Sequence, residues 1–171
     1  MASGNTLLIL TPASGSPPAT LAAQWDELVG TSTPAERVPV FAFDPTTVEY
    51  MDFYGVMPQN YAGGGVTLQL KTGGGTANGV YTFEVAFREV ADDAEDLDTT
   101  AHTYDYNSVD ITGPTAVGEV AYDTLAFTDG ADMDSVGAGD MFVLRIKRNT
   151  ADAQDTMATD AYLHSIEVRE T

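Results

Sequence analysis

The chain has 171 residues, of which 43% are hydrophobic, so it is long enough to form one domain with a sizeable apolar core. Its 26 acidic residues outnumber 7 Lys and Arg residues, and the formal net charge of −19 disfavours nucleic acids and anionic membranes as partners. The absence of cysteine excludes disulfides, thiolate metal sites and cysteine nucleophiles.

Residues 1–37 are predicted to form an extended N-terminal arm, because residues 12–39 hold five prolines among Thr, Ser, Ala and Gly. The apolar run at residues 7–10 is much shorter than the ~20 residues of a membrane span, and no basic residue precedes it. We therefore expect the protein to act where it is made, or to be carried elsewhere by assembly. Within the arm, residues 21–28 predict either a short helix or a tucked segment that packs the single tryptophan. Leu21, Trp25 and Leu28 are the predicted interface residues of this arm.

Residues 38–171 are predicted to form one domain of strands and turns. Apolar and polar residues alternate with period two in residues 66–71, 81–88, 142–147 and 162–169, and more weakly in residues 38–43, 48–53, 103–111 and 117–127. Asn78-Gly79 separates two of these runs and predicts a β-hairpin there. About eight strands with Gly- and Asp-rich turns and long crossing loops predict an all-β fold, an antiparallel β-sandwich of the jelly-roll type.

The sequence contains no catalytic motif, and we predict that the protein is not an enzyme. It lacks the G-x-S-x-G string of nucleophilic hydrolases and the P-loop of nucleotide-binding proteins. Its two histidines stand in different surroundings: His164 is expected to be either a core histidine with its hydrogen bonds satisfied or a half-buried one, and His102 to be more exposed. Pairs of carboxylates could serve a glycosidase, but spacing along the chain does not predict their separation in space.

No cofactor is predicted, and calcium is the one ion that the sequence suggests. Asp129, Asp132, Asp134 and Asp140 follow a predicted strand, and clustered carboxylates on a loop are the ligands that Ca²⁺ prefers. Their order does not match an EF-hand, and Asp-rich loops of an acidic protein are commonly solvated surface.

Aromatic residues gather in residues 50–61, where Tyr50, Phe53, Tyr54 and Tyr61 surround two methionines. Exposed aromatic rings could stack against sugars. Packing in the core or at a subunit interface is the favoured interpretation, with Tyr61 anchoring a loop.

Several blocks of the sequence resemble a known group of proteins. They are residues 43–49 (FDPTTVE), 53–67 (FYGVMPQNYAGGGVT), 127–148 (FTDGADMDSVGAGDMFVLRIKR), 155–161 (DTMATDA) and 166–171 (IEVRET). Together these blocks resemble small virion proteins of tailed bacteriophages, most of them uncharacterised. The resemblance does not include the predicted arm.

This resemblance implies a β-sandwich protein that decorates or cements the outer surface of the capsid after assembly in the host cytoplasm. The implied partners are the major capsid protein and further copies of this chain in a homotrimer, with no nucleic acid and no membrane. A protein that binds only the assembled shell would stabilise that shell by mass action. The arm would contact neighbouring subunits, with Trp25 as its anchor.

Two other functions remain open at the level of sequence. The first is a tail-associated module whose loops hold a host glycan at one end of the jelly roll. The second is a glycan-cleaving enzyme that uses two acidic residues.

Overall fold

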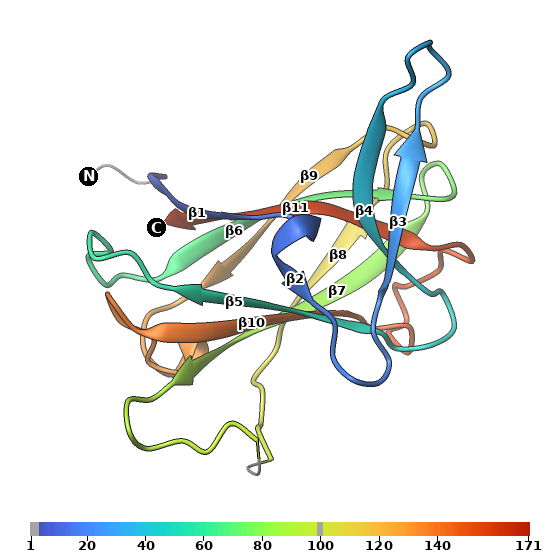
Figure 1. Ribbon diagram of the computed structural model, residues 1–171. Coiled ribbons are helices and arrows are strands. Elements are labelled where there is room, and N and C mark those ends of the chain that lie inside the picture. The colour runs from blue at the N-terminus through green and yellow to red at the C-terminus, as the bar shows by residue number, and fades with distance from the viewer. Residues whose placement is uncertain (1–3, 99–100) are drawn as a thin grey trace.

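The computed structural model describes residues 4–98 and 101–171, and its regular elements are two antiparallel sheets stacked face to face (Figure 1). Sheet A contains, in spatial order, β3 (Gln24–Val29), β4 (Arg37–Phe43), β11 (Ala161–Glu170), β6 (Val66–Gly74) and β9 (Ala121–Phe127), and β1 (Thr6–Leu10) also pairs with β11. Sheet B contains β2 (Gly15–Ser16), β5 (Tyr50–Val56), β10 (Met141–Arg148), β7 (Val80–Val90) and β8 (Asn107–Thr112). The predicted antiparallel β-sandwich is confirmed.

Two short 3₁₀ helices complete the fold, η1 (Pro12–Ser14) and η2 (Ala131–Met133). Neither of these, nor any other helix in the described ranges, is long and apolar enough to cross a membrane.

The core lies between the sheets and follows from the alternation in the strands. Phe142, Leu144 and Ile146 of β10 are fully buried because every second side chain of the strand points inward. Aromatic rings then join the two sheets edge to face: Phe87 of sheet B meets Phe127 of sheet A with ring centroids 5.1 Å apart.

Residues 4–37, predicted as an extended arm, are instead built into both sheets. Two strands share one edge of β11. β4 pairs with residues 161–163 of β11, and β1 pairs with residues 166–169 farther along the same edge. β2 pairs with β5 at the edge of sheet B, and β3 pairs with residues 37–42 of β4. This pairing replaces the helix considered for residues 21–28 and satisfies their backbone groups on one side.

The predicted hairpin at Asn78-Gly79 is also wrong, because β6 lies in sheet A and β7 in sheet B. Asn78 does adopt the left-handed conformation typical of such turns, with φ of 56°. Both edges of β6 are occupied, by β11 and β9, so β7 cannot pair with it and the turn carries the chain across to the other sheet. Gly79 is required there, since a Cβ atom would lie 2.6 Å from the Cγ of Met157.

A buried ion pair fixes the last crossing between the sheets, from β10 to β11. Arg148, the last residue of β10, is fully buried, and its guanidinium donates to both carboxylate oxygens of Asp155 at 2.8 and 2.7 Å. Asp155 also accepts from the backbone N–H of Thr82 at 3.2 Å. The guanidinium donates further to the carbonyl oxygens of Phe43, Thr159 and Met157. One side chain therefore holds β7, β4 and the loop before β11 together.

We predict that Arg148→Met lowers the free energy of unfolding by about 3–5 kcal/mol, because it leaves the buried carboxylate of Asp155 without its cation. Urea denaturation followed by circular dichroism measures this change. The matched control is Arg37→Met: the pair that Arg37 forms with Glu27 is exposed and should contribute less than about 1 kcal/mol. Equal effects of the two substitutions would contradict the role given to Arg148.

A second polar cluster ties three strands of sheet A together on its outer face. Glu167 of β11 accepts hydrogen bonds from Arg169 at 2.8 Å, from Lys71 of β6 at 3.1 Å, and from the hydroxyl of Thr6 in β1. These bonds, led by the one from Arg169, lower the pKa of Glu167 from 4.5 to about 2.

This shift predicts a pH dependence of stability. Because the pKa in the folded protein lies below its ordinary value, the stabilisation by Glu167 is fully present above pH 4.5 and is lost as the pH falls through 2. Glu167→Gln should therefore unfold at a lower temperature than the wild-type protein at pH 7, and the difference should vanish near pH 2. Thermal unfolding of both proteins across this range tests it. A difference that stays constant with pH would show that the charge of Glu167 does not matter.

Candidate binding site on the outer face of sheet B

The outer face of sheet B carries an unusual share of the basic residues of this acidic chain. Arg88, Arg145 and Lys147 point away from the core there, and they are three of only 7 Lys and Arg residues. Each has an acidic partner, at 2.5 Å for Arg88 with Glu95, 2.6 Å for Arg145 with Asp52 and 2.7 Å for Lys147 with Glu84. This face is therefore close to charge balance on a protein of net charge −19.

Arg145 is the centre of this arrangement. Its Nε and Nη2 atoms donate to the two carboxylate oxygens of Asp52 at 2.6 and 2.7 Å, and these hydrogen bonds raise the pKa of Arg145. Its guanidinium lies 4.2 Å from the ring centroid of Tyr104 and 5.7 Å from that of Tyr50. Asp52 occupies two of its five N–H donors, which leaves donors for a further acceptor.

Residues 101–106, here called the cover segment, belong to the connection that leads from β7 to β8 in the chain (Figure 1). Their tyrosines lie against the basic residues of this face. Tyr106 stands 4.3 Å from the Nζ atom of Lys147, and burial raises the pKa of Tyr106 to about 12. Ala86 and Val143 point outward between core positions, yet both are fully buried. The middle of the face is therefore closed to solvent.

The face opens at its edge, where the loop between β2 and β3 passes beside β5. A cavity of about 250 Å³ lies there, lined by Pro18, Thr20, Leu21, Tyr50 and Arg145. Two backbone hydrogen bonds hold the loop in place: the N–H of Tyr50 donates to Leu21 at 2.7 Å, and the N–H of Ala23 donates to Tyr50 at 2.9 Å. We call this cavity the Tyr50 pocket.

Leu21 shows that the loop is held in a strained conformation. Its φ of 56° lies in the left-handed region, which costs a residue with a branched side chain about 1–2 kcal/mol. Its side chain is nevertheless 54% exposed and packs into no core. Strain of this kind, kept without a packing gain, is a feature of ligand-binding loops.

The Tyr50 pocket combines aromatic, cationic, polar and apolar groups. Its lining offers the ring of Tyr50, the planar cation of Arg145, the hydroxyl of Thr20, and two apolar side chains. These groups can supply hydrogen bonds and aromatic stacking to a bound molecule.

The structure does not bring the four predicted calcium ligands together. Asp129 accepts from the hydroxyl of Tyr61 at 3.2 Å, Asp132 from the N–H of Thr128 at 2.6 Å, Asp134 from that of Glu89 at 3.0 Å, and Asp140 from that of Gly137 at 2.7 Å. Across residues 4–98 and 101–171, no group of three or more His, Asp or Glu side chains is placed to hold a metal ion. Tyr61 is buried and anchors its loop as predicted.

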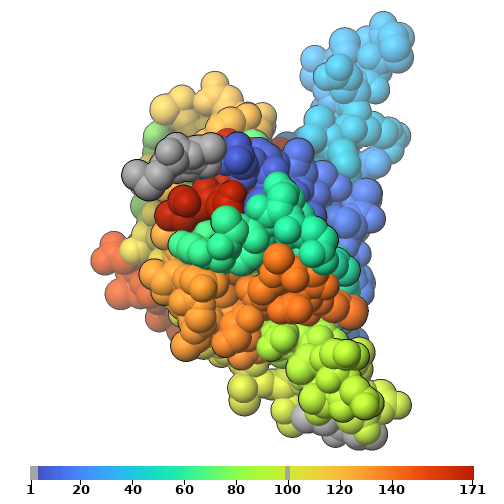
Figure 2. All heavy atoms as spheres, turned by 90° about the vertical axis from the view of Figure 1, so that its left-hand side faces the viewer, coloured from blue at the N-terminus to red at the C-terminus, as the bar shows by residue number. Residues whose placement is uncertain are grey.

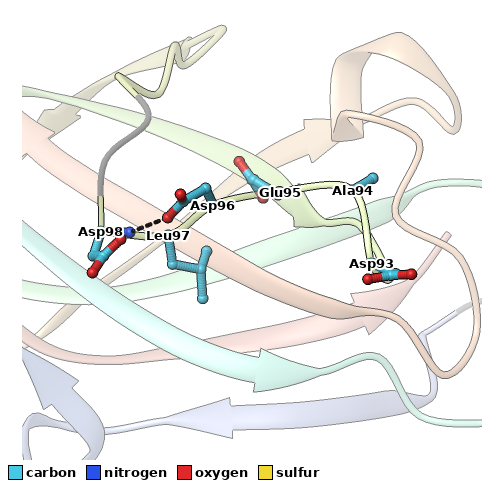
Figure 3. Close-up of a pocket in the computed structure, with 6 residues that line it drawn as sticks. All are labelled: Asp93, Ala94, Glu95, Asp96, Leu97 and Asp98. Atoms are coloured by element: carbon cyan, nitrogen blue, oxygen red, sulfur yellow. Dashed lines mark hydrogen bonds between the residues drawn. The ribbon is translucent and has the colours of Figure 1, made fainter.

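The acidic loop at residues 93–98 borders a second cavity, shown in Figure 3. Its carboxylates do not converge: Asp93 lies at the far end of the loop from Asp96 and Asp98, and the N–H of Asp98 donates to Asp96 at 3.3 Å. Glu95 instead turns to Arg88 and to Nδ1 of His102, at 2.5 and 2.8 Å. His102, expected to be exposed, is half-buried in this contact.

The structure places the three predicted interface residues at three different sites. Trp25 is 54% exposed on β3, an edge strand, where its ring packs edge to face on Phe41 at 5.9 Å. Leu21 lines the Tyr50 pocket, and Leu28 is half-buried beside a separate cavity of about 280 Å³ that also contains His164.

His164 is half-buried, which confirms one of the two placements predicted for it. A bulge in β11 between Leu163 and Ser165 turns His164 away from the core. Its Nε2 atom is buried without a hydrogen-bond partner among the described residues, and burial lowers the pKa of His164.

Comparison with known proteins gives likeness at the level of fold. No family model matches the chain, and no curated protein matches it in sequence. The CBM22-2 xylan-binding domain from Paenibacillus barcinonensis Xyn10C superposes with a TM-score of 0.54 at 9% identity, covering 96% of this chain and 99% of that domain. The CBM22-1 xylan-binding domain of the same protein gives 0.52 at 8% identity, with 99% and 96% covered. The carbohydrate-binding module CBM36, solved with calcium and xylotriose, gives 0.51 at 13% identity, with 95% and 99% covered. These likenesses show a jelly-roll fold.

Proposed function

We propose that this protein is a non-catalytic carbohydrate-binding module and that the Tyr50 pocket is its binding site. The observation that carries the proposal is the meeting of Tyr50 and Arg145 in an open pocket on the outer face of the sandwich. Sugar rings have apolar C–H faces that stack on aromatic rings, and hydroxyl groups that bond to planar charged side chains. Both kinds of contact are available within this one pocket.

The solved structures of similar fold support the same function. Two of them are named as xylan-binding domains, and a third was solved with xylotriose. At 8–13% identity none of their residues carries over to this chain, so the proposal rests on its own side chains.

Affinity electrophoresis through gels that contain soluble xylan, mannan, β-glucan or galactan tests this function. We expect at least one polysaccharide to retard the wild-type protein, and Tyr50→Ala to weaken that binding by about tenfold or more, equivalent to about 1.4 kcal/mol. The matched control is Tyr122→Ala, because Tyr122 is 63% exposed on the outer face of the other sheet. Equal retardation of the two variants would show that the binding site lies outside the Tyr50 pocket. If none of the four polysaccharides retarded the wild-type protein, the proposed function would be contradicted.

A virion location is a second proposal, supported by the sequence resemblance and by the shape of the molecule. The hairpin of β3 and β4 projects from the sandwich (Figures 1 and 2), and Trp25, Val29 and Val38 on it are exposed. Such a projection suits contact with a capsid protein or with further copies of this chain in a trimer. This location is compatible with glycan binding, since a module on a particle surface can face the host.

The copy number of the protein in purified phage particles tests the location. We expect a ratio to the major capsid protein near one if the protein decorates the head, measured by quantitative mass spectrometry with labelled peptides. A few copies per particle would favour the tail instead. Absence from the particle would contradict both virion locations and leave the Tyr50 pocket as the only basis for function.

A further inference from the structure

We infer that the Tyr50 pocket takes one uncharged sugar ring at the end of a glycan, rather than a stretch of chain laid along the sheet. This inference rests on the proposed carbohydrate-binding function and names the class of ligand for the same site. Three features of the structure lead to it: the size of the pocket, the closed face around Arg145, and the distribution of charge.

The size of the pocket limits what can enter it. Its volume of about 250 Å³ lies below the range of about 300–1,000 Å³ typical of pockets for drug-sized ligands. Its lining is short as well, with one aromatic ring and one cation. A single six-membered ring matches this space, and a second ring would extend into solvent.

The residues around Arg145 block the sides from which a glycan chain laid along the sheet would contact it. Along β10 the neighbouring outward positions are Val143, which is fully buried, and Lys147, which pairs with Glu84 and lies against the ring of Tyr106. Across to β7 the residue paired with Arg145 is Ala86, which is also fully buried. On β5 the paired residue is Asp52, which is 4% exposed and bound to Arg145 itself. The open side that remains is bounded by Tyr50 and the loop that carries Leu21.

Tyr104 strengthens this boundary. Its ring lies 4.2 Å from the guanidinium of Arg145 and occupies one face of that cation. A ligand that reaches Arg145 must therefore approach from the side of Tyr50, with its end directed inward. This geometry selects the terminal ring of a glycan.

The charges favour a neutral ring over an acidic one. Asp52 already pairs with Arg145 through two hydrogen bonds, so its carboxylate offsets the positive charge that would otherwise attract an acidic ring. The net charge of −19 repels a uronic acid over distances of about 10 Å at 0.1 M salt. Both effects act against acidic sugars, and the second weakens as salt is added.

Ligand-observed saturation-transfer NMR with monosaccharides tests the inference on the full chain. The probes are D-glucose, D-galactose, D-mannose and D-xylose, with D-glucuronic and D-galacturonic acid as the charged set. We expect at least one neutral sugar to bind, at least about tenfold more tightly than its uronic acid at low salt, with the ratio falling as salt increases.

Two variants separate loss of the site from loss of the fold. Leu21→Gly removes a lining side chain while relieving the left-handed strain, so it should remain folded and bind about tenfold more weakly. Tyr122→Ala should bind as the wild-type protein does. Thermal unfolding of each variant checks that the fold is kept.

The results distinguish this inference from the function on which it rests. Polysaccharide binding that depends on Tyr50, combined with no monosaccharide binding, would overturn the end-ring inference and leave the carbohydrate-binding function intact. Tighter binding of a uronic acid than of its neutral sugar would overturn the charge argument. Binding of neither polysaccharides nor monosaccharides would overturn both.

Discussion

The fully buried pair of Arg148 and Asp155 is the interaction on which the arrangement of the two sheets depends. A buried charge is stable only when it is paired and its remaining donors are satisfied, and Arg148 meets this demand with three backbone carbonyl oxygens as well as its carboxylate. One of those carbonyls belongs to Phe43 in sheet A, whereas Arg148 ends a strand of sheet B. The pair therefore sets where β10 ends and how the chain returns to β11.

The position of β10 in turn decides where the proposed binding site lies. Arg145 lies three residues before Arg148 on the same central strand, and the alternation that sends Leu144 and Ile146 into the core sends Arg145 outward. Pairing with β5 places Asp52 opposite Arg145. A rigid strand in the middle of a sheet is thus the support for the polar group of the pocket, and a strained loop supplies its rim. This division between a rigid support and a loop that carries specificity is common in binding proteins.

The cover segment closes the middle of the outer face of sheet B to solvent. Tyrosine rings stacked on Arg145 and Lys147, together with acidic partners for each cation, make the middle of the face closed and nearly neutral. The face is open at its edge, in the Tyr50 pocket, where the loop between β2 and β3 lies beside Tyr50. The same loop links an edge strand of sheet B to an edge strand of sheet A, so the site lies where the two sheets are joined.

The sequence by itself determined the class of fold, because period-two alternation is a local property that each strand of residues 66–74 or 141–148 carries within itself. It also determined that the protein is acidic and that Arg145 and Lys147 share one face of their strand. Only the tertiary structure decided which strands pair: Asn78-Gly79 has the local conformation of a hairpin turn, yet the edges of β6 were already occupied. It likewise placed residues 4–37 in the sheets and brought Tyr50, Tyr104 and Arg145 together from three distant segments. Such contacts depend on long-range competition for strand edges, and no local pattern of residues encodes that competition.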